Sequence, residues 1–395
     1  MDPSTAAEAE PPPPEPSGRT PLREIAWLFL RLGATSFGGP AAHVGMMERE
    51  VVQRRGWLTR EQFLDMMSAA NLIPGPNSTE MAIHIGWARA RWAGLVVAGA
   101  CFIAPAALIT LAVAWAYVRY GTLPAATGML YGVKPVVIAI VAQAVWRLGR
   151  SALRTRAMAA VAAATAALGA VGANELALLL GAGAVMALPA WLRERKGSGM
   201  SPSPPMLLIP PVGLAAAPQF GLTPLFLFFL KVGSVLYGSG YVLIAFLRSD
   251  LVEQRGWLTD QQLLDAVALG QATPGPVFTT ATFIGYLLGG VEGASLATLG
   301  IFLPAFVFVA ASGPLIPRLR KSRVAGAFLD GVNAASLAIM FVVACELGRS
   351  AVVDPITACL ALASGVMLIR SPINSAWLIL AGALVGIAAT PAGPR

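Results

Sequence analysis

The chain contains one sequence segment twice. Residues 56–80 read "GWLTREQFLDMMSAANLIPGPNSTE" and residues 256–280 read "GWLTDQQLLDAVALGQATPGPVFTT". Between residues 50–65 and 250–265, nine of 16 positions are identical without a gap. Each copy keeps Pro-Gly-Pro inside an apolar run. Because proline lacks a backbone donor and clashes with the preceding turn, each Pro-Gly-Pro predicts the end of one helix and the start of another.

The surrounding composition is that of a membrane protein. The chain has 395 residues, of which 56% are hydrophobic and 12% charged, and its mean hydropathy is +0.69. Soluble domains have about 45–50% apolar and about 25% charged residues. Several apolar runs approach the roughly 20 residues that a helix needs to cross a bilayer. We therefore predict an all-α polytopic membrane protein with helices broken by Pro and Gly.

The duplication covers most of the chain. Residues 29–40 align with 229–240, and residues 132–151 align with 331–350 after the offset changes from 200 to 199. A unit of this length is too long for a solenoid and matches the internal repeats of secondary transporters. We divide the chain into a disordered Pro-rich tail (1–21), a first transporter repeat (22–196), a linker (197–223) and a second repeat (224–395). The tail has no apolar core and does not resemble a signal peptide.

Six membrane segments are expected in each repeat. The Pro-rich linker residues 206–222 are uncharged and would add a thirteenth segment, which opposite orientation of the halves requires; otherwise one broken segment must be re-entrant. The expected segments are 24–47, 62–88, 92–118, 124–146, 157–172 and 175–192, with counterparts at 224–247, 262–288, 291–312, 325–346, 356–370 and 374–390.

Loop charges predict how the two repeats are oriented. The loop near Arg119 has one basic residue, whereas its counterpart at 318–323 has four. The next loop reverses this bias, with four arginines at 147–156 against a mixed-charge counterpart at 346–354. Since basic loops stay on the cytoplasmic side, equivalent loops should face opposite sides, which is an inverted repeat. The same rule accounts for the net charge of +8 without a nucleic-acid partner.

The broken helices predict a binding site. After the first break, "NSTE" at 77–80 has the side chains of a helix start, and the second break is followed by Thr279 and Thr280. Unbonded N–H groups at helix starts attract anions. Irregular backbone at membrane depth survives only where it lines a cavity or is buried in protein. Two breaks in inverted halves would bring two such starts together, although a purely structural kink remains the alternative.

Few ionisable residues fall inside the expected segments. Lys134 is one of them, and a bare cation there costs roughly 2.5–3.5 kcal/mol. Either a permanent carboxylate partner or an anionic substrate can offset that cost, and the sequence leaves both open. Glu80, His84 and His43 occur only in the first repeat. A protonatable Glu or His in a span can relay protons, and a packing role for either histidine is equally open.

Other residues have structural interpretations. Thr59 and Thr259 are predicted helix N-caps, each preceded by an interfacial Trp and an anchoring Arg. Glu50 lies in a basic loop and is expected to be solvated or interfacial. The three cysteines at 101, 345 and 359 lack metal-ligand spacing and are expected to be small buried hydrophobes. We expect no metal and no cofactor.

Two segments resemble the two signatures of long chromate ion transporters: residues 36–86, beginning "SFGGPAAHVGMM", and residues 237–290, ending "FTTATFIGYLLGG". The resemblance extends from about residue 21 to the C-terminus. It implies a carrier of the bacterial inner membrane with antiparallel halves, which exports chromate at the expense of the proton motive force. The N-terminus would be cytoplasmic. The predicted substrate-binding residues are Gly38, Gly39, Pro40, His43, Pro74, Gly75, Pro76, Asn77, Ser78, Thr79, Lys134, Gly238, Gly240, Pro274, Gly275, Pro276, Thr279 and Thr280, and Glu80 and His84 are predicted to couple protons.

Rival functions remain to be separated. A carrier or channel for sulfate or another small anion would use the same donors. An enzyme is not expected, because the sequence contains neither H-E-x-x-H nor a P-loop lysine motif. The expected partners are an oxyanion and the lipid bilayer, and the oligomeric state, homodimer included, stays open.

Overall fold

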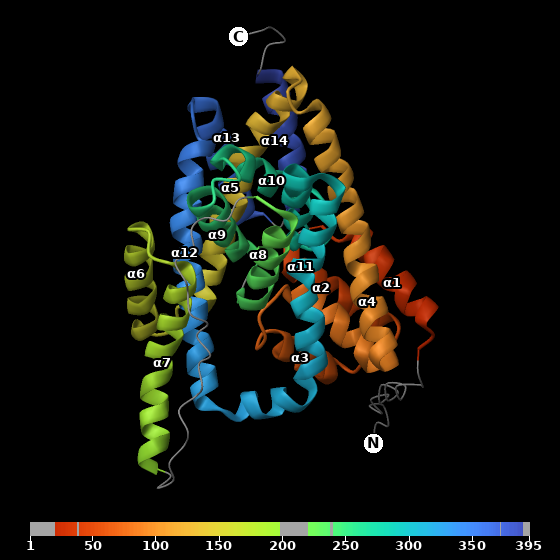
Figure 1. Cartoon of the computed structure of the whole chain (residues 1–395), viewed down its shortest axis with the longest axis vertical. Coiled ribbons are helices and arrows are strands. Elements are labelled where there is room, and N and C mark those ends of the chain that lie inside the picture. The colour runs from red at the N-terminus through yellow and green to blue at the C-terminus, as the bar shows by residue number, and fades with distance from the viewer. Residues whose placement is uncertain (1–19, 38, 198–219, 238–239, 372, 390–395) are drawn as a thin grey trace, which may run out of the picture.

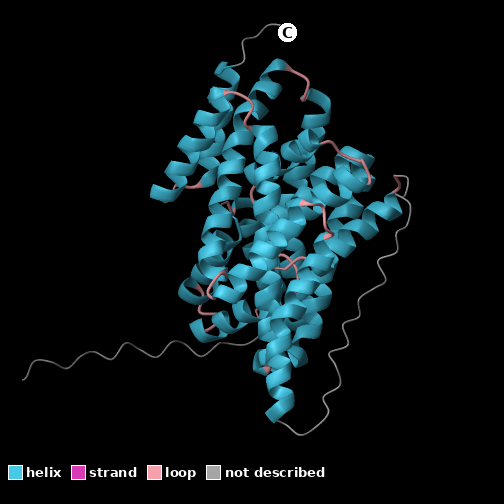
Figure 2. Cartoon of the chain, turned by 90° about the vertical axis from the view of Figure 1, so that its left-hand side faces the viewer, coloured by secondary structure: helices cyan, strands magenta, loops and turns pink. Residues whose placement is uncertain are grey.

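We describe the chain from a computed structural model, which places residues 20–37, 39–197, 220–237, 240–371 and 373–389. These residues form helices joined by short loops, without a strand among them (Figures 1 and 2). Five helical spans are long and apolar enough to cross a membrane, namely Asn77–Tyr120, Pro124–Arg150, Glu175–Arg195, Val277–Ser312 and Arg323–Ala351. The prediction of an all-α polytopic membrane protein is confirmed.

Both repeats have the same order of helices, except that two elements of the first repeat are each divided in two in the second. The first consists of α1 (Leu22–Thr35), α2 (Gly39–Glu48), the π-helical η1 (Arg49–Arg54), α3 (Arg60–Ala70), α4 (Asn77–Tyr120), α5 (Pro124–Ala152), α6 (Arg156–Ala170) and α7 (Glu175–Gly197). The second consists of α8 (Leu222–Val235), η2 (Gly240–Val242), α9 (Leu243–Leu247), the π-helical η3 (Arg248–Gln254), α10 (Asp260–Ala272), η4 (Val277–Thr279), α11 (Thr280–Lys321), α12 (Arg323–Ala351), α13 (Pro355–Arg370) and α14 (Ser375–Ala389).

The helix boundaries refine the expected segments. The first segment of each repeat is split in two, because α1 ends at Thr35 and α8 at Val235. The second and third segments are joined through a bend, at Ala90 and Arg91 in α4 and at Gly289 and Gly290 in α11. Most of the expected thirteenth segment lies outside the described residues.

The two repeats exchange their last helices. Helices α6 and α7 pack against α12, and α13 and α14 pack against α5 (Figure 1). Glycines allow these close contacts. A Cβ on Gly132 of α5 would overlap the carbonyl of Gly382 in α14, and one on Gly331 of α12 would overlap that of Ala182 in α7. Small residues at such crossings are typical of membrane helix packing.

Equivalent helices α5 and α12 run antiparallel across each other. A Cβ on Gly149 would lie 3.6 Å from Leu337, and one on Gly348 would lie 3.6 Å from Ile138. Gly149 and Gly348 are repeat equivalents, and so are Ile138 and Leu337, so the two contacts are the same contact with the helices exchanged. Helix α5 therefore runs in the opposite direction to α12. This is the pattern that a twofold axis perpendicular to the two helices would produce.

The turn between η1 and α3 is repeated between η3 and α10. Thr59 and Thr259 each form a capping box, which confirms both predicted N-caps. The guanidinium of Arg55 lies 5.1 Å from the ring centre of Trp57, and that of Arg255 lies 4.8 Å from Trp257. These contacts stabilise the approach to each broken helix.

Two expectations for buried and exposed residues were wrong. Glu50 is only 7% exposed, because the π-helical turn directs it inward, where it binds Arg54 at 2.7 Å and Arg55 at 3.5 Å. Cys345 and Cys359 are exposed on the helix surface, where we expected buried packing residues, and Cys101 is half-buried.

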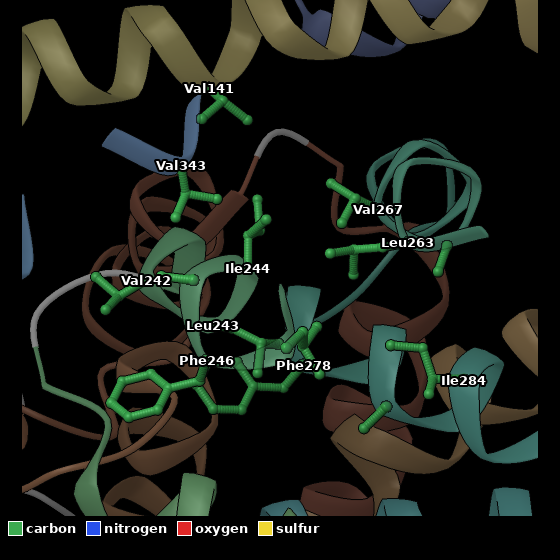
Figure 3. Packing of buried hydrophobic residues seen from close by; sticks show 14 of the residues in the cluster. Val141, Val242, Leu243, Ile244, Phe246, Leu263, Val267, Phe278, Ile284 and Val343 are labelled. Carbon is green, nitrogen blue, oxygen red and sulfur yellow. The ribbon is translucent and has the colours of Figure 1, made fainter. Parts of the chain in front are cut away.

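Helix α10 lies within the main apolar core. Leu263 and Val267 of α10 face Ile244 of α9 and Phe278 of η4, with Val141 of α5 and Val343 of α12 close by (Figure 3). The core thus joins α5 of the first repeat to the broken-helix region of the second. Any polar side chain on the same part of α10 is placed in apolar surroundings.

Candidate functional site

Each Pro-Gly-Pro break is hydrogen-bonded to the opposite repeat. The Gly75 N–H donates to the Leu236 carbonyl at 2.8 Å, and the Gly275 N–H donates to the Ser36 carbonyl at 2.8 Å. Ser36 and Leu236 are the C-cap residues of α1 and α8 and directly follow their last helical residues. The break in one repeat therefore meets the end of the first helix in the other, and both breaks are buried in protein.

The central glycine of each break is required by conformation and by space. Gly75 has φ +140° and Gly275 has φ +98°, which L side chains rarely adopt. A Cβ on Gly275 would overlap Ala106 of α4. A Cβ on Gly75 would overlap Glu80 Oε1 and lie 3.9 Å from Ala305, the repeat equivalent of Ala106.

The start of α4 carries polar groups without a partner. Thr79 and Glu80 are fully buried, and within the described residues neither Thr79 Oγ1 nor either Glu80 oxygen has a hydrogen bond. His84 follows Glu80 by one turn on the same helix face, and its Nε2 is also unpartnered there. Asn77 and Ser78 occupy the first helical positions, whose N–H groups have no acceptor within a helix. These groups can receive a proton or a polar ligand.

The start of α11 differs from that of α4. Thr279 Oγ1 donates to the Pro276 carbonyl at 2.9 Å, and Thr280 Oγ1 donates to the Val277 carbonyl at 2.8 Å. Both hydroxyl protons are thus directed to the backbone in this conformation. Among the described residues, these two hydroxyls therefore differ from Thr79 Oγ1, which has no partner, although the sequence predicted similar roles for both breaks.

The breaks after α1 and α8 are partly described. Gly39 starts α2 with φ +79°, Pro40 follows it, and Gly38 and Gly238 lie outside the described residues. His43 of α2 is 1% exposed and lies beside the backbone of Ser36, the C-cap residue of α1. Its ring packs edge-on against Phe102, with centroids 5.9 Å apart. A Cβ on Gly240 would lie 3.4 Å from Phe278 beside the second break.

Lys134 forms a buried ion pair between the two repeats. Its Nζ lies 2.8 Å from Asp265 Oδ1, and the side chains are 7% and 5% exposed. The Tyr117 hydroxyl donates to Asp265 Oδ2 at 2.8 Å. Of the two alternatives for Lys134, the carboxylate partner is the one present in this structure.

The predicted residues fall into two groups. The Pro-Gly-Pro segments meet the ends of α1 and α8, as their hydrogen bonds show. Lys134 lies elsewhere: its partner Asp265 precedes Thr273, at the end of α10, by eight residues, or about 12 Å of helix. The structure therefore joins Lys134 to the second break through α10, without direct contact.

Asp265 and Tyr117 were missed as candidate site residues. Asp265 is one of the nine identities between residues 50–65 and 250–265, and its repeat equivalent Asp65 is exposed. The available signal was its setting in "LLDAVALG", since an acidic residue within an apolar helix needs a partner.

Comparisons with known proteins identify the family of this chain. The profile of the chromate transporter family matches residues 23–188 and 223–387. The chain is 34% identical over 378 residues to the chromate transport protein of Cupriavidus metallidurans, covering 94% of each chain. It is 32% identical over 354 residues to the chromate transport protein of Pseudomonas aeruginosa, covering 87% of this chain and 83% of that one. No solved structure matches the chain significantly. With both repeats matched, the chain belongs to the chromate transporter family, which is a family of membrane transporters and not of enzymes.

Proposed function

We propose that this protein exports chromate across the bacterial inner membrane and couples export to the proton motive force. The observation that carries the proposal is the buried polar group at the first break, where Thr79, Glu80 and His84 have atoms without partners among the described residues. Such groups are costly in an apolar interior unless they serve a ligand or a proton. The relatives named as chromate transport proteins give the substrate class.

The chemistry of the breaks suits an oxyanion. Chromate is a tetrahedral dianion whose oxygens accept hydrogen bonds from several directions. The N–H groups of Asn77 and Ser78 lie at the positive end of the α4 dipole, and the hydroxyls of Ser78 and Thr79 are buried beside them. Lys134 lies apart from the first break, beside α10, and would give the oxyanion a second, cationic contact on its path when the ion pair with Asp265 opens.

We further propose that the two repeats have opposite orientations in the membrane. The reversed loop charges and the antiparallel crossing of α5 and α12 support this arrangement. A twofold axis perpendicular to spanning helices lies in the membrane plane, as in transporters with inverted repeats. The N-terminus would then be cytoplasmic.

Glu80 is the proposed coupling group. The second repeat has no acidic residue at the equivalent position, which is Thr280 or a neighbour. Its position against Gly75 places any change of its charge at the first break. His84, one turn further along α4, would pass protons to or from it.

Transport by everted membrane vesicles tests the proposal. Vesicles containing the wild-type protein should accumulate radiolabelled chromate when energised, and a protonophore should abolish the accumulation. Lys134→Ala should remove at least about 90% of the uptake, because the site loses its cation, while membrane insertion checked by immunoblot stays normal. Lys231→Ala removes a more exposed lysine and is the matched control.

The same assay separates the rival functions. Accumulation of sulfate with chromate excluded would identify a sulfate carrier. Flux that ignores the proton gradient and does not saturate would identify an anion channel. Normal chromate uptake by Lys134→Ala would exclude a role for Lys134 in substrate binding.

A further inference from the structure

The Lys134–Asp265 pair, buried on both sides, is unlike the ion pairs of Glu50 and Asp250, whose basic partners are exposed. Glu50 and Asp250 are repeat equivalents and each binds the equivalent basic residue of its own repeat, Arg31 at 3.8 Å or Lys231 at 3.0 Å. That arrangement is duplicated, as a structural feature of the repeat would be. Lys134 and Asp265 instead come from different repeats.

The repeat equivalents of this pair do not form a second one. Asn333 replaces Lys134 on α12, and Asp65 is exposed on α3. The Lys134–Asp265 pair is therefore present in one orientation only. A role in holding the two repeats together would be served equally well by a symmetric pair, so the asymmetry points to a function.

The surroundings of Lys134 already fit a negatively charged oxygen. Asp265 Oδ1 lies 2.8 Å from the ammonium nitrogen of Lys134, and the Tyr117 hydroxyl donates a hydrogen bond to Asp265 Oδ2 at 2.8 Å. The neighbouring cavity, lined by Val137, Leu264 and other apolar residues, has a volume of about 10 Å³. This space barely holds one water, and neither Lys134 nor Asp265 lines it. Because the two charged groups are 2.8 Å apart and both side chains are buried, a tetrahedral oxyanion reaches Lys134 only when the carboxylate leaves.

Helix α10 provides a route for that movement. It is a half-helix that ends at the second break, where Thr273 Oγ1 lies 3.5 Å from Thr110 Oγ1 of α4. A shift of α10 therefore moves Asp265 relative to Lys134 on α5. Tyr117 belongs to α4 and can keep a partner on the carboxylate while it moves.

We propose that Asp265 is an internal counter-anion, which occupies Lys134 in the substrate-free protein and is displaced by the transported oxyanion. The inference rests on the proposed function and adds a positioning residue to it. Binding of the oxyanion replaces one negative oxygen on Lys134 by another, so the cation is never left unpaired in the apolar interior. Return of Asp265 then drives the oxyanion off Lys134 and completes release.

The test is Asp265→Asn in the full-length protein reconstituted in lipid nanodiscs and in proteoliposomes. Because nothing competes for Lys134, the Kd for chromate should fall at least about tenfold, and the maximal transport rate should fall with it because release slows. If Asp265 only stabilises the fold, Asp265→Asn should instead weaken chromate binding and raise the Kd. A Kd equal to or above the wild-type value, in a folded variant, overturns the proposal.

Asp250→Asn is the matched control, since it also removes a buried carboxylate from a lysine, Lys231. Its Kd for chromate should equal that of the wild type. If the wild-type protein itself neither binds nor transports chromate, the proposed function fails, and this outcome is distinct from failure of the counter-anion.

If Asp265→Asn does not assemble in the membrane, a second measurement on the wild-type protein still tests the proposal. Infrared difference spectra of the wild-type protein labelled with ¹³C-aspartate should show a carboxylate band that shifts when chromate is added. In Asp265→Glu the shifting band should lose its isotope dependence. Absence of any chromate-induced aspartate band in the wild type overturns the proposal.

Discussion

The amide of Gly75 donates a 2.8 Å hydrogen bond to the carbonyl of Leu236, which lies in the other repeat. The equivalent donor Gly275 binds Ser36 at the same distance. Buried backbone groups at helix ends need partners, and here each repeat supplies the partner for the other. Together with the exchange of terminal helices, these bonds make the two repeats one folding unit at the breaks.

Gly275→Ala should block transport more strongly than Gly75→Ala. The new Cβ at 275 would overlap the Cβ of Ala106, which cannot move without its helix, whereas at 75 it would meet the flexible end of Glu80. We expect Gly275→Ala to destabilise the protein by about 2–4 kcal/mol, from positive-φ strain and overpacking. Thermal unfolding in detergent and vesicle uptake of chromate measure both effects.

Two further variants isolate the cause. Gly172→Ala has the same positive-φ strain, with φ +81°, but no atom within 4 Å of the new Cβ, so it reports strain alone. Ala106→Gly should restore part of the activity of Gly275→Ala by returning the space. Equal loss in Gly172→Ala and Gly275→Ala would contradict the packing argument.

Local chemistry explains what the sequence could predict. Single prolines at 105, 135 and 189 lie inside helices, whereas Pro-Gly-Pro ends one. The breaks at 74–76 and 274–276 therefore follow from local sequence, as do the N-caps Thr59 and Thr259. The duplication itself was visible as repeated residue identities. The reciprocal bonds of Gly75 and Gly275 were not predictable, because their acceptors depend on how the two repeats dock.

The environment of equivalent residues also needed the structure. Asp65 and Asp265 follow similar residues, Gln-Phe-Leu and Gln-Leu-Leu, yet α3 leaves its aspartate exposed while α10 is covered by α5. Glu50 was misjudged for a related reason. A basic loop is normally solvated, but its π-helical turn directs this carboxylate into the protein, where arginines surround it. Side-chain direction in a π-turn is not encoded in charge pattern.

Cysteine labelling should place equivalent loops on opposite sides of the membrane. Thr122 lies between α4 and α5, and Arg323 begins α12 at the equivalent loop; both are exposed. In a background with all three native cysteines replaced by serine, an impermeant thiol reagent should label Thr122→Cys in intact cells and Arg323→Cys only in everted vesicles. Labelling of both from one side would show parallel repeats.

Glu50→Gln should lower stability at neutral pH. Burial alone would raise the pKa of Glu50, but hydrogen bonding to Arg54 and the charges of Arg54 and Arg31 outweigh it and lower the pKa below its ordinary value. A lowered folded-state pKa contributes stability above the unfolded pKa, and this stability is lost as the pH falls through the folded value.

We expect Glu50→Gln to cost about 1–3 kcal/mol at pH 7, and the difference from wild type to shrink as the pH falls below about 4. Thermal unfolding of the purified protein as a function of pH measures it. Glu48→Gln is the control, because the pair of Glu48 with Arg60 is long, at 3.8 Å, and the arginine is exposed. A pH-independent difference would rule out the ionised carboxylate as its source.

Glu80→Gln should separate chromate flux from the proton gradient. The side chain is fully buried and its oxygens have no hydrogen bond in the described part of the chain, so an ionised carboxylate there is costly and a neutral amide of the same shape is tolerated. Thermal stability should therefore be unchanged or higher. In everted vesicles, uptake by the variant should be insensitive to a pH step that changes wild-type uptake severalfold, because the variant has no proton to exchange at the first break.

Glu61→Gln, which changes an exposed carboxylate on α3, should behave like the wild type. Since His84 lies one turn away, His84→Gln should slow the response to the pH step without abolishing it. A Glu80→Gln protein with the wild-type pH profile would assign coupling to another residue.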